Sequence, residues 1–402
     1  MERDRFKNNF CLKCHRNFFL WHIFLILFIS STVCNAQDSN TTSKHYPPKT
    51  IWEIPHKTTW EKWMWIHRSF AFEITKERKI NYDTAYIKSY YRRLVVTLPF
   101  FTRFLKFSLI DPVSGNKLVF APNLQYNMGI SISSRWASFI VNSGVKLFPS
   151  DISTKGKTSY KDYQMNLYGR KFTTDMFVQY YSGFYIRNSK SYNNYISNAP
   201  YFIRNDVNAL NLGVSTYYII NHKRFSYGNS FAFVDQQKKS AGSLLLGLYY
   251  SYFDATGSPS LITAPFRISF DSLSYIKSGH SHNFGLNIGY IYTLVFLKKC
   301  YATASVVQGI GAEQLIYIHD DNSVTNQLTG DAGKLNVRLA MGYDCGRYFI
   351  GAMGMFDYYL LSGKSNSAFE YSFGKAMIYI GYRFSILKTE RKILHRLKLI
   401  DY

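Results

Sequence analysis

The feature that most constrains this chain is a strict alternation of apolar and polar side chains, clearest between Lys334 and Tyr343. Every second residue there is apolar, and the apolar row consists of Leu335, Val337, Leu339, Met341 and Tyr343. Because successive side chains of an extended chain point to opposite faces, this stretch has one apolar and one polar face. A tilted strand needs roughly ten residues to cross a bilayer. The stretch therefore predicts a membrane-spanning β-strand.

The same alternation recurs along the chain after Asp83 and predicts twelve strands. They span residues 92–109, 122–133, 134–147, 162–169, 171–187, 207–221, 242–254, 282–296, 299–312, 333–344, 347–359 and 372–386. Strands of soluble β-sandwiches usually have about five or six residues, and most of these are about twice as long. The lengths favour a membrane barrel over a sandwich.

The connections between these strands alternate in length. Short turns are expected near Ser133 and at 169–170, 298–299 and 344–347, whereas long polar loops are expected at 148–161, 188–206, 312–332 and 360–371. Short turns on one side and long loops on the other are typical of outer-membrane barrels. The 34 Tyr residues also suit strands that cross a water–lipid boundary.

We therefore predict an all-β fold: a transmembrane antiparallel up-and-down β-barrel of about twelve strands at residues 83–386. With an even number of strands, the N- and C-terminal ends of the chain both lie on the periplasmic side of the membrane. The count requires 222–241 to be a structured periplasmic segment. A strand at Phe231–Val234 would move it toward fourteen, and ten is the other alternative.

The segments that flank the barrel have separate predicted roles. Residues 1–36 combine basic residues, the apolar run Phe18–Ile29 and a small-residue end, which is the pattern of a secretory signal peptide. Cys34 is an alternative site of lipid attachment, although Val33 before it fits poorly. Residues 37–82 are expected to form a periplasmic linker and a short amphipathic helix from Thr59, packed on a membrane interface or on ordinary protein. Residues 387–402 are expected to be a basic periplasmic tail.

Several local runs resemble an uncharacterised family of Bacteroides-type outer-membrane proteins, the domain of unknown function 4421. The runs are Asp83–Ile87 (DTAYI), Tyr168–Phe172 (YGRKF), Tyr181–Tyr185 (YSGFY), Asn221–Tyr227 (NHKRFSY) and Gln237–Ser243 (QKKSAGS). The resemblance covers about residues 80–386. It implies a signal-bearing barrel in the cell outer membrane and brings no known activity, substrate or catalytic residue.

The charge balance suggests the kind of partner. Lys and Arg number 48 against 25 Asp and Glu, a formal charge of +23. The basic residues are spread through turns and loops, without a zinc-finger spacing or ribonucleoprotein motif, so nucleic acid is not the expected partner. Outer-membrane lipid headgroups and lipopolysaccharide phosphates are expected instead, with the barrel-assembly machinery as a partner during biogenesis. The oligomeric state stays open.

Three classes of function remain open on the sequence. The leading one is a barrel for envelope structure, binding or small-solute passage. The second is an outer-membrane enzyme that modifies phospholipid or lipopolysaccharide, and the third is a secreted soluble β protein. Phosphate-cradling, dinucleotide and zinc-protease motifs do not occur after the signal segment, and no cofactor, metal ligand or catalytic residue is predicted.

Four charged residues lie on the polar faces of predicted strands, where the lumen is expected: Asp175, Arg338, Asp344 and Arg383. A charge that faced lipid would cost a few kcal/mol, so these side chains should point inward. In a narrow barrel such charges fill the interior as ion pairs. The alternative is the lining of a pore or a ligand site.

Two histidine motifs offer weaker candidates for chemistry. His280 and His282 share one face of a strand, with Ser281 and Asn283 between and after them, so a metal site or a Ser–His–Asn nucleophile site is an alternative to a plain polar strand start. The run from His319 to Asp321 is read as a solvated loop tip rather than a cation site.

The cysteines suggest one disulfide bond. If residues 312 and 333 pair across their hairpin, the same register pairs Cys300 with Cys345, and an oxidising periplasm permits a bond. The run Cys11–His15 matches a haem-attachment pattern but precedes the apolar run of the signal segment, so haem is not expected.

Overall fold

The computed structural model describes residues 81–385, apart from 91–92, 112, 135–136, 147–150, 193–194, 196–197, 271–274 and 361–368. The predicted signal segment, the helix expected from Thr59 and the basic tail lie outside the described residues. Those parts of the prediction therefore stay predictions.

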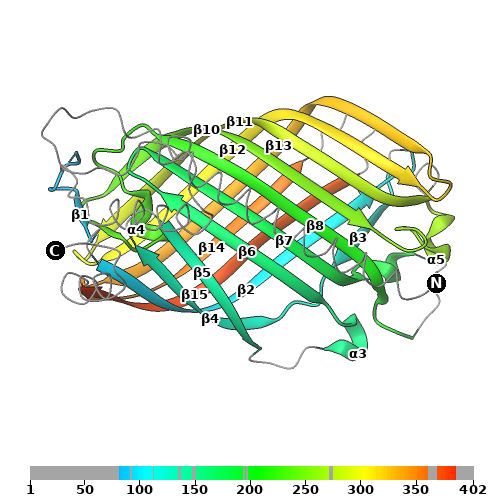
Figure 1. The fold of residues 1–402 in the computed structure, drawn as a ribbon, viewed down its shortest axis with the longest axis horizontal. Helices are drawn as coiled ribbons and strands as arrows, with labels where there is room; N and C mark the ends of the chain where they lie inside the picture. The colour runs from blue at the N-terminus through cyan, green and yellow to red at the C-terminus, as the bar shows by residue number, and fades with distance from the viewer. Residues whose placement is uncertain are drawn as a thin grey trace, which may run out of the picture. The chain divides into compact units, whose positions relative to one another are not determined.

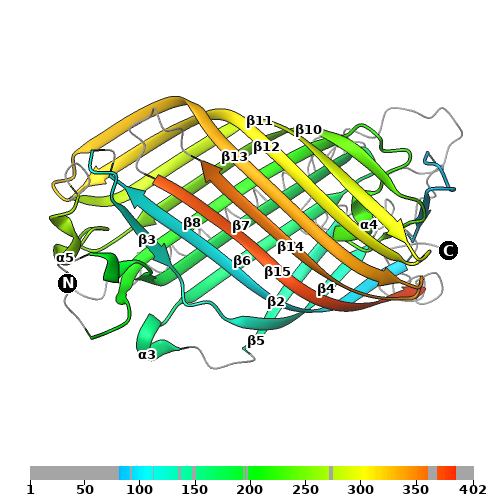
Figure 2. The ribbon, with the colours of Figure 1, turned by 180° about the vertical axis from the view of Figure 1, so that it is seen from behind.

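Long antiparallel strands form the wall of a closed barrel (Figures 1 and 2). They are β2 (Arg93–Ile110), β4 (Tyr126–Ser134), β5 (Ala137–Lys146), β6 (Ser159–Tyr168), β7 (Phe172–Ile186), β8 (Phe202–Ile219), β10 (Ala241–Thr256), β11 (Ile276–Phe296), β12 (Cys300–His319), β13 (Val324–Asp344), β14 (Tyr348–Leu360) and β15 (Phe369–Ser385). Each corresponds to one strand predicted from the alternation, so the all-β barrel is confirmed.

The barrel closes in two ways because of a short strand that the alternation did not reveal. This strand, β3 (Lys117–Ala121), pairs with β2 and β7 and completes a ring of ten strands. β4, β5 and β6 form a longer path between the same two strands. β5 and β6 pair only from Ala137 to Phe139, opposite Leu167 to Met165.

The two ends of the barrel differ. Short connections at 169–171, 297–299 and 345–347 define one end, here called the turn end, which also carries β1 (Ile87–Ser89), β9 (Asp235–Gln237) and α4 (Tyr227–Phe231) (Figure 1). The opposite end, here called the loop end, carries α3 (Ile152–Lys155), η2 (Ser189–Ser191) and α5 (Ala264–Arg267). None of the helices in the described ranges is long and apolar enough to cross a membrane.

The prediction of a long loop at 312–332 is wrong. β12 and β13 continue as a paired hairpin, and their connection is confined to residues 320–323. In β12 the inward Leu315 and Tyr317 alternate with the outward Ile316 and Ile318, so apolar residues lie on both faces and the alternation fades while the backbone pairing continues. Gln314 Nε2 donates to Asn326 Oδ1 at 3.2 Å across this part of the hairpin. β8 and β11 likewise begin about five residues earlier than their alternation indicates.

The segment 222–241 is structured and adds no strand to the barrel wall, as the count required. It turns into α4 and then into β9, which pairs with β1 in a separate small sheet. Phe231 to Val234, the stretch that could have been another strand, is fully buried as the end of α4 and the residues after it.

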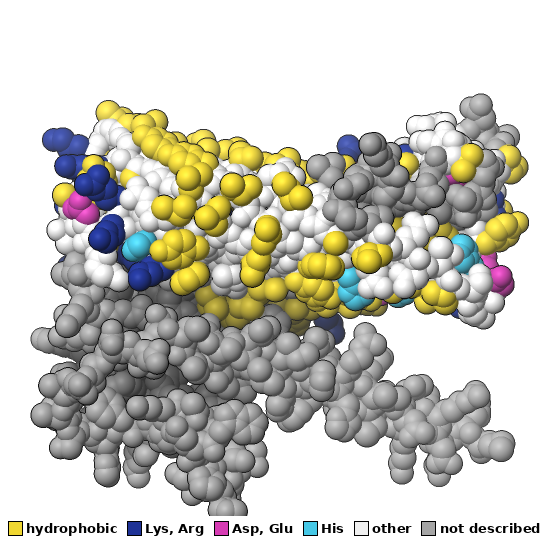
Figure 3. Space-filling view, turned by 90° about the horizontal axis from the view of Figure 1, so that it is seen from above, with side chains coloured by type: hydrophobic (Ala, Val, Ile, Leu, Met, Phe, Trp, Pro, Cys, Tyr) yellow, Lys and Arg dark blue, Asp and Glu magenta, His cyan; other side chains and the backbone are white. Residues whose placement is uncertain are grey.

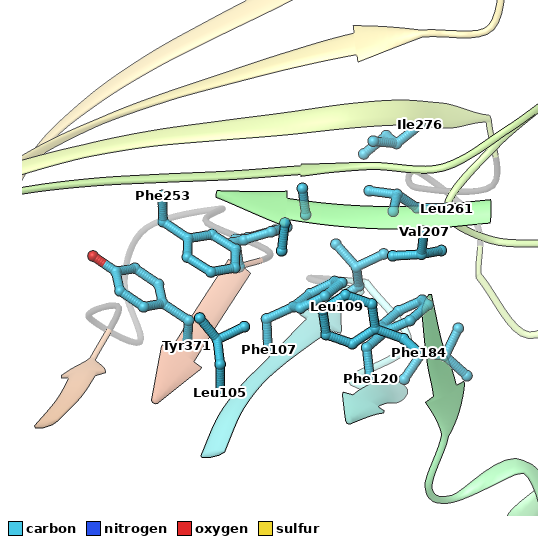
Figure 4. Packing of buried hydrophobic residues seen from close by; sticks show 14 of the residues in the cluster. Leu105, Phe107, Leu109, Phe120, Phe184, Val207, Phe253, Leu261, Ile276 and Tyr371 are labelled. Atoms are coloured by element: carbon cyan, nitrogen blue, oxygen red, sulfur yellow. The ribbon is translucent and has the colours of Figure 1, made fainter. Parts of the chain in front are cut away.

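Two buried apolar clusters lie inside the barrel, one toward each end. At the loop end, Phe107 stacks on Phe120 at 4.6 Å between ring centres, and Phe253 stacks on Tyr371 at 4.4 Å (Figure 4). At the turn end, Phe231 and Phe233 belong to a second buried cluster, and the Phe233 ring lies 4.4 Å from that of Tyr379. Between the two clusters the inward side chains are mostly polar.

One glycine is required by the shape of the wall. Gly183 lies at an irregularity of the β7–β8 pairing with φ +86, and a Cβ there would lie 2.2 Å from the carbonyl oxygen of Lys157. We predict that Gly183→Ala destabilises the barrel by more than about 1 kcal/mol, because both the strain and the clash oppose it. The measurement is thermal unfolding in detergent.

Gly354→Ala is the matched control, since a Cβ at Gly354 meets nothing within 4 Å. Equal unfolding temperatures for the two variants would show that the conformation of Gly183 is not required.

Candidate functional site in the barrel lumen

The polar rows of the strands point into the barrel, where they form a layer of buried charges, here called the lumen belt. Its members are Arg103, Asp162, Asp175, Lys334, Arg338, Asp357 and Lys375. They come from β2, β6, β7, β13, β14 and β15, so residues far apart in sequence meet only because the sheet closes. Burying an unpaired charge is costly, so the pairing within the belt determines whether the barrel is stable.

Arg338 lies at the centre of the belt. Its Nη2 is 2.8 Å from Asp175 Oδ2, and its Nε donates to Asn336 Oδ1 at 3.1 Å. Its Nη1 donates to Tyr227 Oη at 2.8 Å, so one guanidinium joins two strands of the wall to α4. Burial raises the pKa of Tyr227 well above its usual value, which keeps the phenol protonated beside the arginine.

The other two predicted lumen charges, Asp344 and Arg383, lie at the turn end and form an ion pair. Arg383 binds Asp344 through two nitrogens, at 2.8 and 2.7 Å. Its Nε donates to the carbonyl oxygen of Phe233 at 2.8 Å, which ties the segment after α4 to β15. The guanidinium also lies over the ring of Tyr90 at 4.3 Å. The structure thus brings the four predicted charges together as two separate ion pairs.

Two further ion pairs were not predicted. Arg103 lies 3.2 Å from Asp162, and Lys334 lies 3.5 Å from Asp357. β2 is apolar on both faces near Arg103, which hides the alternation there. Lys334 is four residues before Arg338 in the same strand, so the alternation alone could have predicted that its side chain also points into the lumen.

Little open space remains between these side chains. A cavity of about 30 Å³ lies among Asp175, Arg338, Asp357 and Lys375, which is room for about two water molecules. Lys375 Nζ donates to Gln164 Oε1 at 2.9 Å beside it. The belt can order water and neutralise charge, and the cavity among these residues is too small for a larger solute.

The histidine pair lies outside the lumen. His280 and His282 are half-exposed on the outer face of β11, where Tyr252 Oη lies 3.2 Å from His280 Nδ1 and Tyr250 Oη lies 3.0 Å from His282 Nδ1. Ser281 is buried on the opposite face and donates to Glu313 at 2.5 Å.

Asn283 lies beside Ser281 on the lumen side and donates to its oxygen at 2.7 Å. The alternative of a Ser–His–Asn site built from these neighbours is therefore wrong, because side chains of opposite parity lie on opposite faces of the strand. Across the ranges that the structure describes, no three His, Cys, Asp or Glu side chains gather into a group that could hold a metal ion.

The remaining polar motif belongs to the turn between β12 and β13. His319 Nε2 lies 3.0 Å from Thr325 Oγ1, Asp320 pairs with Arg267 at 3.1 Å, and Asp321 accepts from the backbone N–H of Ser323 at 2.9 Å. These contacts stabilise the hairpin and leave the three side chains pointing to different partners.

The two cysteines are free in the structure. The register expected for them is wrong, since Cys300 lies opposite Tyr343 and Cys345 follows the end of β13. Gly333 pairs with Ile310 rather than with Ala312, so the pairing assumed for the hairpin was two residues out of register. Cys345 Sγ donates instead to the carbonyl oxygen of Tyr348 at 3.1 Å.

Comparison with protein families gives one match. Residues 81–384 match the family described as Domain of unknown function (DUF4421), and the chain belongs to this family. A search of curated proteins found no match.

Several solved structures are similar in fold. The outer membrane protease OmpT from Escherichia coli has 9% identity and a TM-score of 0.36, covering 77% of this chain and all (100%) of that chain. The translocator domain of the autotransporter NalP from Neisseria meningitidis has 10% identity and a TM-score of 0.33, covering 79% and 94%. The toluene transporter TodX from P. putida has 8% identity and a TM-score of 0.27, covering 72% and 89%. Scores this low transfer no activity to the present chain.

The belt predicts a clear difference between buried and exposed ion pairs. Arg338→Met should destabilise the barrel by about 3–5 kcal/mol, because it leaves Asp175 charged and buried without its partner. The measurement is the free energy of unfolding in urea, with the protein refolded in detergent.

Arg224→Met is the control, since Arg224 and Asp83 form an exposed pair at 3.6 Å that is worth at most about 1 kcal/mol. A loss at Arg338 no larger than the loss at Arg224 would contradict the structural role of the belt.

Proposed function

We propose that this protein is an outer-membrane β-barrel whose lumen is filled by its own side chains, so that it serves as a closed structural and binding scaffold rather than an open pore. The observation that carries the proposal is the contact between Arg338 and Tyr227 at 2.8 Å, which joins the charged belt to the segment that fills the turn end.

The outer wall supports a membrane location. Along β11, every second residue from Phe284 to Phe296 is apolar or aromatic and exposed. This outward row consists of Phe284, Leu286, Ile288, Tyr290, Tyr292, Leu294 and Phe296. Such a row is about 40 Å long and covers roughly 30 Å of height when tilted, close to a bilayer's apolar thickness. A secreted soluble β protein would have to expose this surface to water at high cost.

The distribution of charge supports an orientation. Exposed basic side chains gather at the turn end: Lys88, Lys171, Lys223, Arg224, Lys238, Lys239, Lys298, Lys299 and Arg347. On the face drawn in Figure 3, Lys and Arg side chains gather at this end, on the left. Many directly follow or precede an outward apolar row, so their heads reach the level of lipid phosphates. With short turns on the periplasmic side, these residues would meet anionic phospholipid, and lipopolysaccharide would meet the loop end.

Two measurements test the proposal. We expect the exported protein to fractionate with outer membranes and to migrate differently on gels before and after heating. In planar bilayers the refolded protein should give no reproducible conductance steps, because the belt and both aromatic clusters fill the lumen.

A porin inserted into the same lipid provides the sensitivity control. Reproducible steps from the refolded wild-type protein would contradict the closed lumen, and a fully soluble exported product would contradict the membrane location.

A further inference from the structure

Three side chains on the outer wall of the barrel are arranged like the serine, histidine and aspartate of a serine hydrolase. Ser278 Oγ lies 3.3 Å from His280 Nε2, and His280 Nδ1 lies 3.1 Å from Asp254 Oδ1. The serine therefore contacts one nitrogen of the imidazole and the carboxylate contacts the other. This is the arrangement that activates a serine hydroxyl as a nucleophile.

The pairing of β10 with β11 produces this arrangement. Asp254 lies directly opposite His280, so their outward side chains are cross-strand neighbours. Ser278 is two residues before His280 and has the same outward parity. The β11–β12 pairing is irregular between Ile276 and Ser278, next to the serine.

Two of the three side chains are accessible from outside the barrel. The side chains of His280 and Asp254 are 23% and 25% exposed, whereas Ser278 is nearly covered. A carboxylate beside Nδ1 favours the tautomer with a proton on that nitrogen. Nε2 is then free to accept the proton of the Ser278 hydroxyl.

The site lies where the outward surface changes from apolar to polar. Along β11, Phe284 begins the apolar row, and the next outward residues toward the loop end are His282, His280 and Ser278. If the apolar row lies in the bilayer, the three residues are at the level where acyl chains join their headgroups.

We propose that Ser278, His280 and Asp254 form a catalytic triad that hydrolyses the carboxylic esters of membrane lipids. The choice of a lipid substrate rests on the proposed membrane location, whereas the triad itself rests on the three side chains. The activity goes beyond the closed scaffold, because it uses the outer wall and needs nothing from the lumen.

The reaction follows from the positions of the two imidazole nitrogens. Ser278 Oγ attacks the ester carbonyl carbon while its proton passes to His280 Nε2, and Asp254 stabilises the imidazolium that results. The carbon–oxygen bond to the alcohol then breaks, and Nε2 returns the proton to the leaving alcohol oxygen. Water attacks the acyl-serine, again gives its proton to Nε2, and releases the fatty acid with regeneration of the Ser278 hydroxyl.

The neighbouring side chains hold the imidazole in place. Tyr252 Oη lies 3.2 Å from His280 Nδ1, and its ring stacks on that of His280 at 6.5 Å between ring centres. Thr256 Oγ1 donates to Asp254 Oδ1 at 3.4 Å. His282, which the sequence made equally eligible, has its Nδ1 beside Tyr250 rather than beside a carboxylate, so His280 is the assigned base.

The test uses the full-length exported protein, folded in detergent and treated with a fluorophosphonate probe that attaches to activated serines. We expect labelling at Ser278, located by peptide mass, and none in Ser278→Ala. Asp254→Asn should slow labelling by at least about tenfold through the loss of the correct tautomer. Ser323→Ala, an exposed serine of the β12–β13 turn, should label like the wild type.

Substrate turnover is then measured with phospholipid vesicles, with lipopolysaccharide and with a water-soluble short-chain ester. Release of fatty acid from either lipid, lost about 10³-fold in Ser278→Ala, would support the proposal and identify the source of the ester. Turnover of the soluble ester alone would overturn the lipid substrate. Folded wild-type protein that neither labels at Ser278 nor hydrolyses any of the three would overturn the triad, whatever the conductance and fractionation results.

Discussion

The fold depends on the pairing of charges inside the barrel. A barrel with an apolar exterior must turn its polar rows inward, and charges held there are stable only with a partner at hydrogen-bond distance. Arg338 has three such partners on two strands and on α4. Arg383 does the same at the turn end, where it holds Asp344 and the backbone of Phe233. The contacts of these two guanidinium groups pair the buried carboxylates of Asp175 and Asp344 and also hold α4 and the segment after it inside the turn end.

The strands could be predicted from the sequence, because the side-chain period of an extended chain is fixed by its geometry. The same period indicated that Asp175 and Arg338 face inward, but not that they meet. Their strands, β7 and β13, lie far apart in the wall and face each other across the lumen, so the contact requires the closed ring. Local alternation also missed β3, whose five residues are too few to show a period. The expected disulfide register was wrong because the pairing assumed for the β12–β13 hairpin was two residues out.

On the outer wall, only residues an even number of positions apart in a strand share a face, and this decides which side chains can contact the histidines. Sequence neighbours suggested Ser281 and Asn283 as partners of the histidines, yet these two residues face the lumen. The partners that lie close are Ser278, two residues away, and Asp254, on the neighbouring strand. The serine was within reach of a parity argument, whereas the aspartate required the register of β10 with β11. The triad lies on β10 and β11, whereas the charges of the lumen belt come from other strands, so the two sets share neither a strand nor a side chain.

The most direct test of the closed lumen is the reactivity of a thiol in the segment that fills the turn end. Phe231→Cys is made in a Cys300→Ser, Cys345→Ser background and exposed to a membrane-impermeant maleimide, with Lys239→Cys as the exposed reference. The wild-type Phe231 side chain is 4% exposed, so its replacement should react far more slowly than the reference and become reactive when Arg338 is also replaced by Ala. Equal reaction rates at positions 231 and 239 in the folded barrel would contradict a lumen closed by α4.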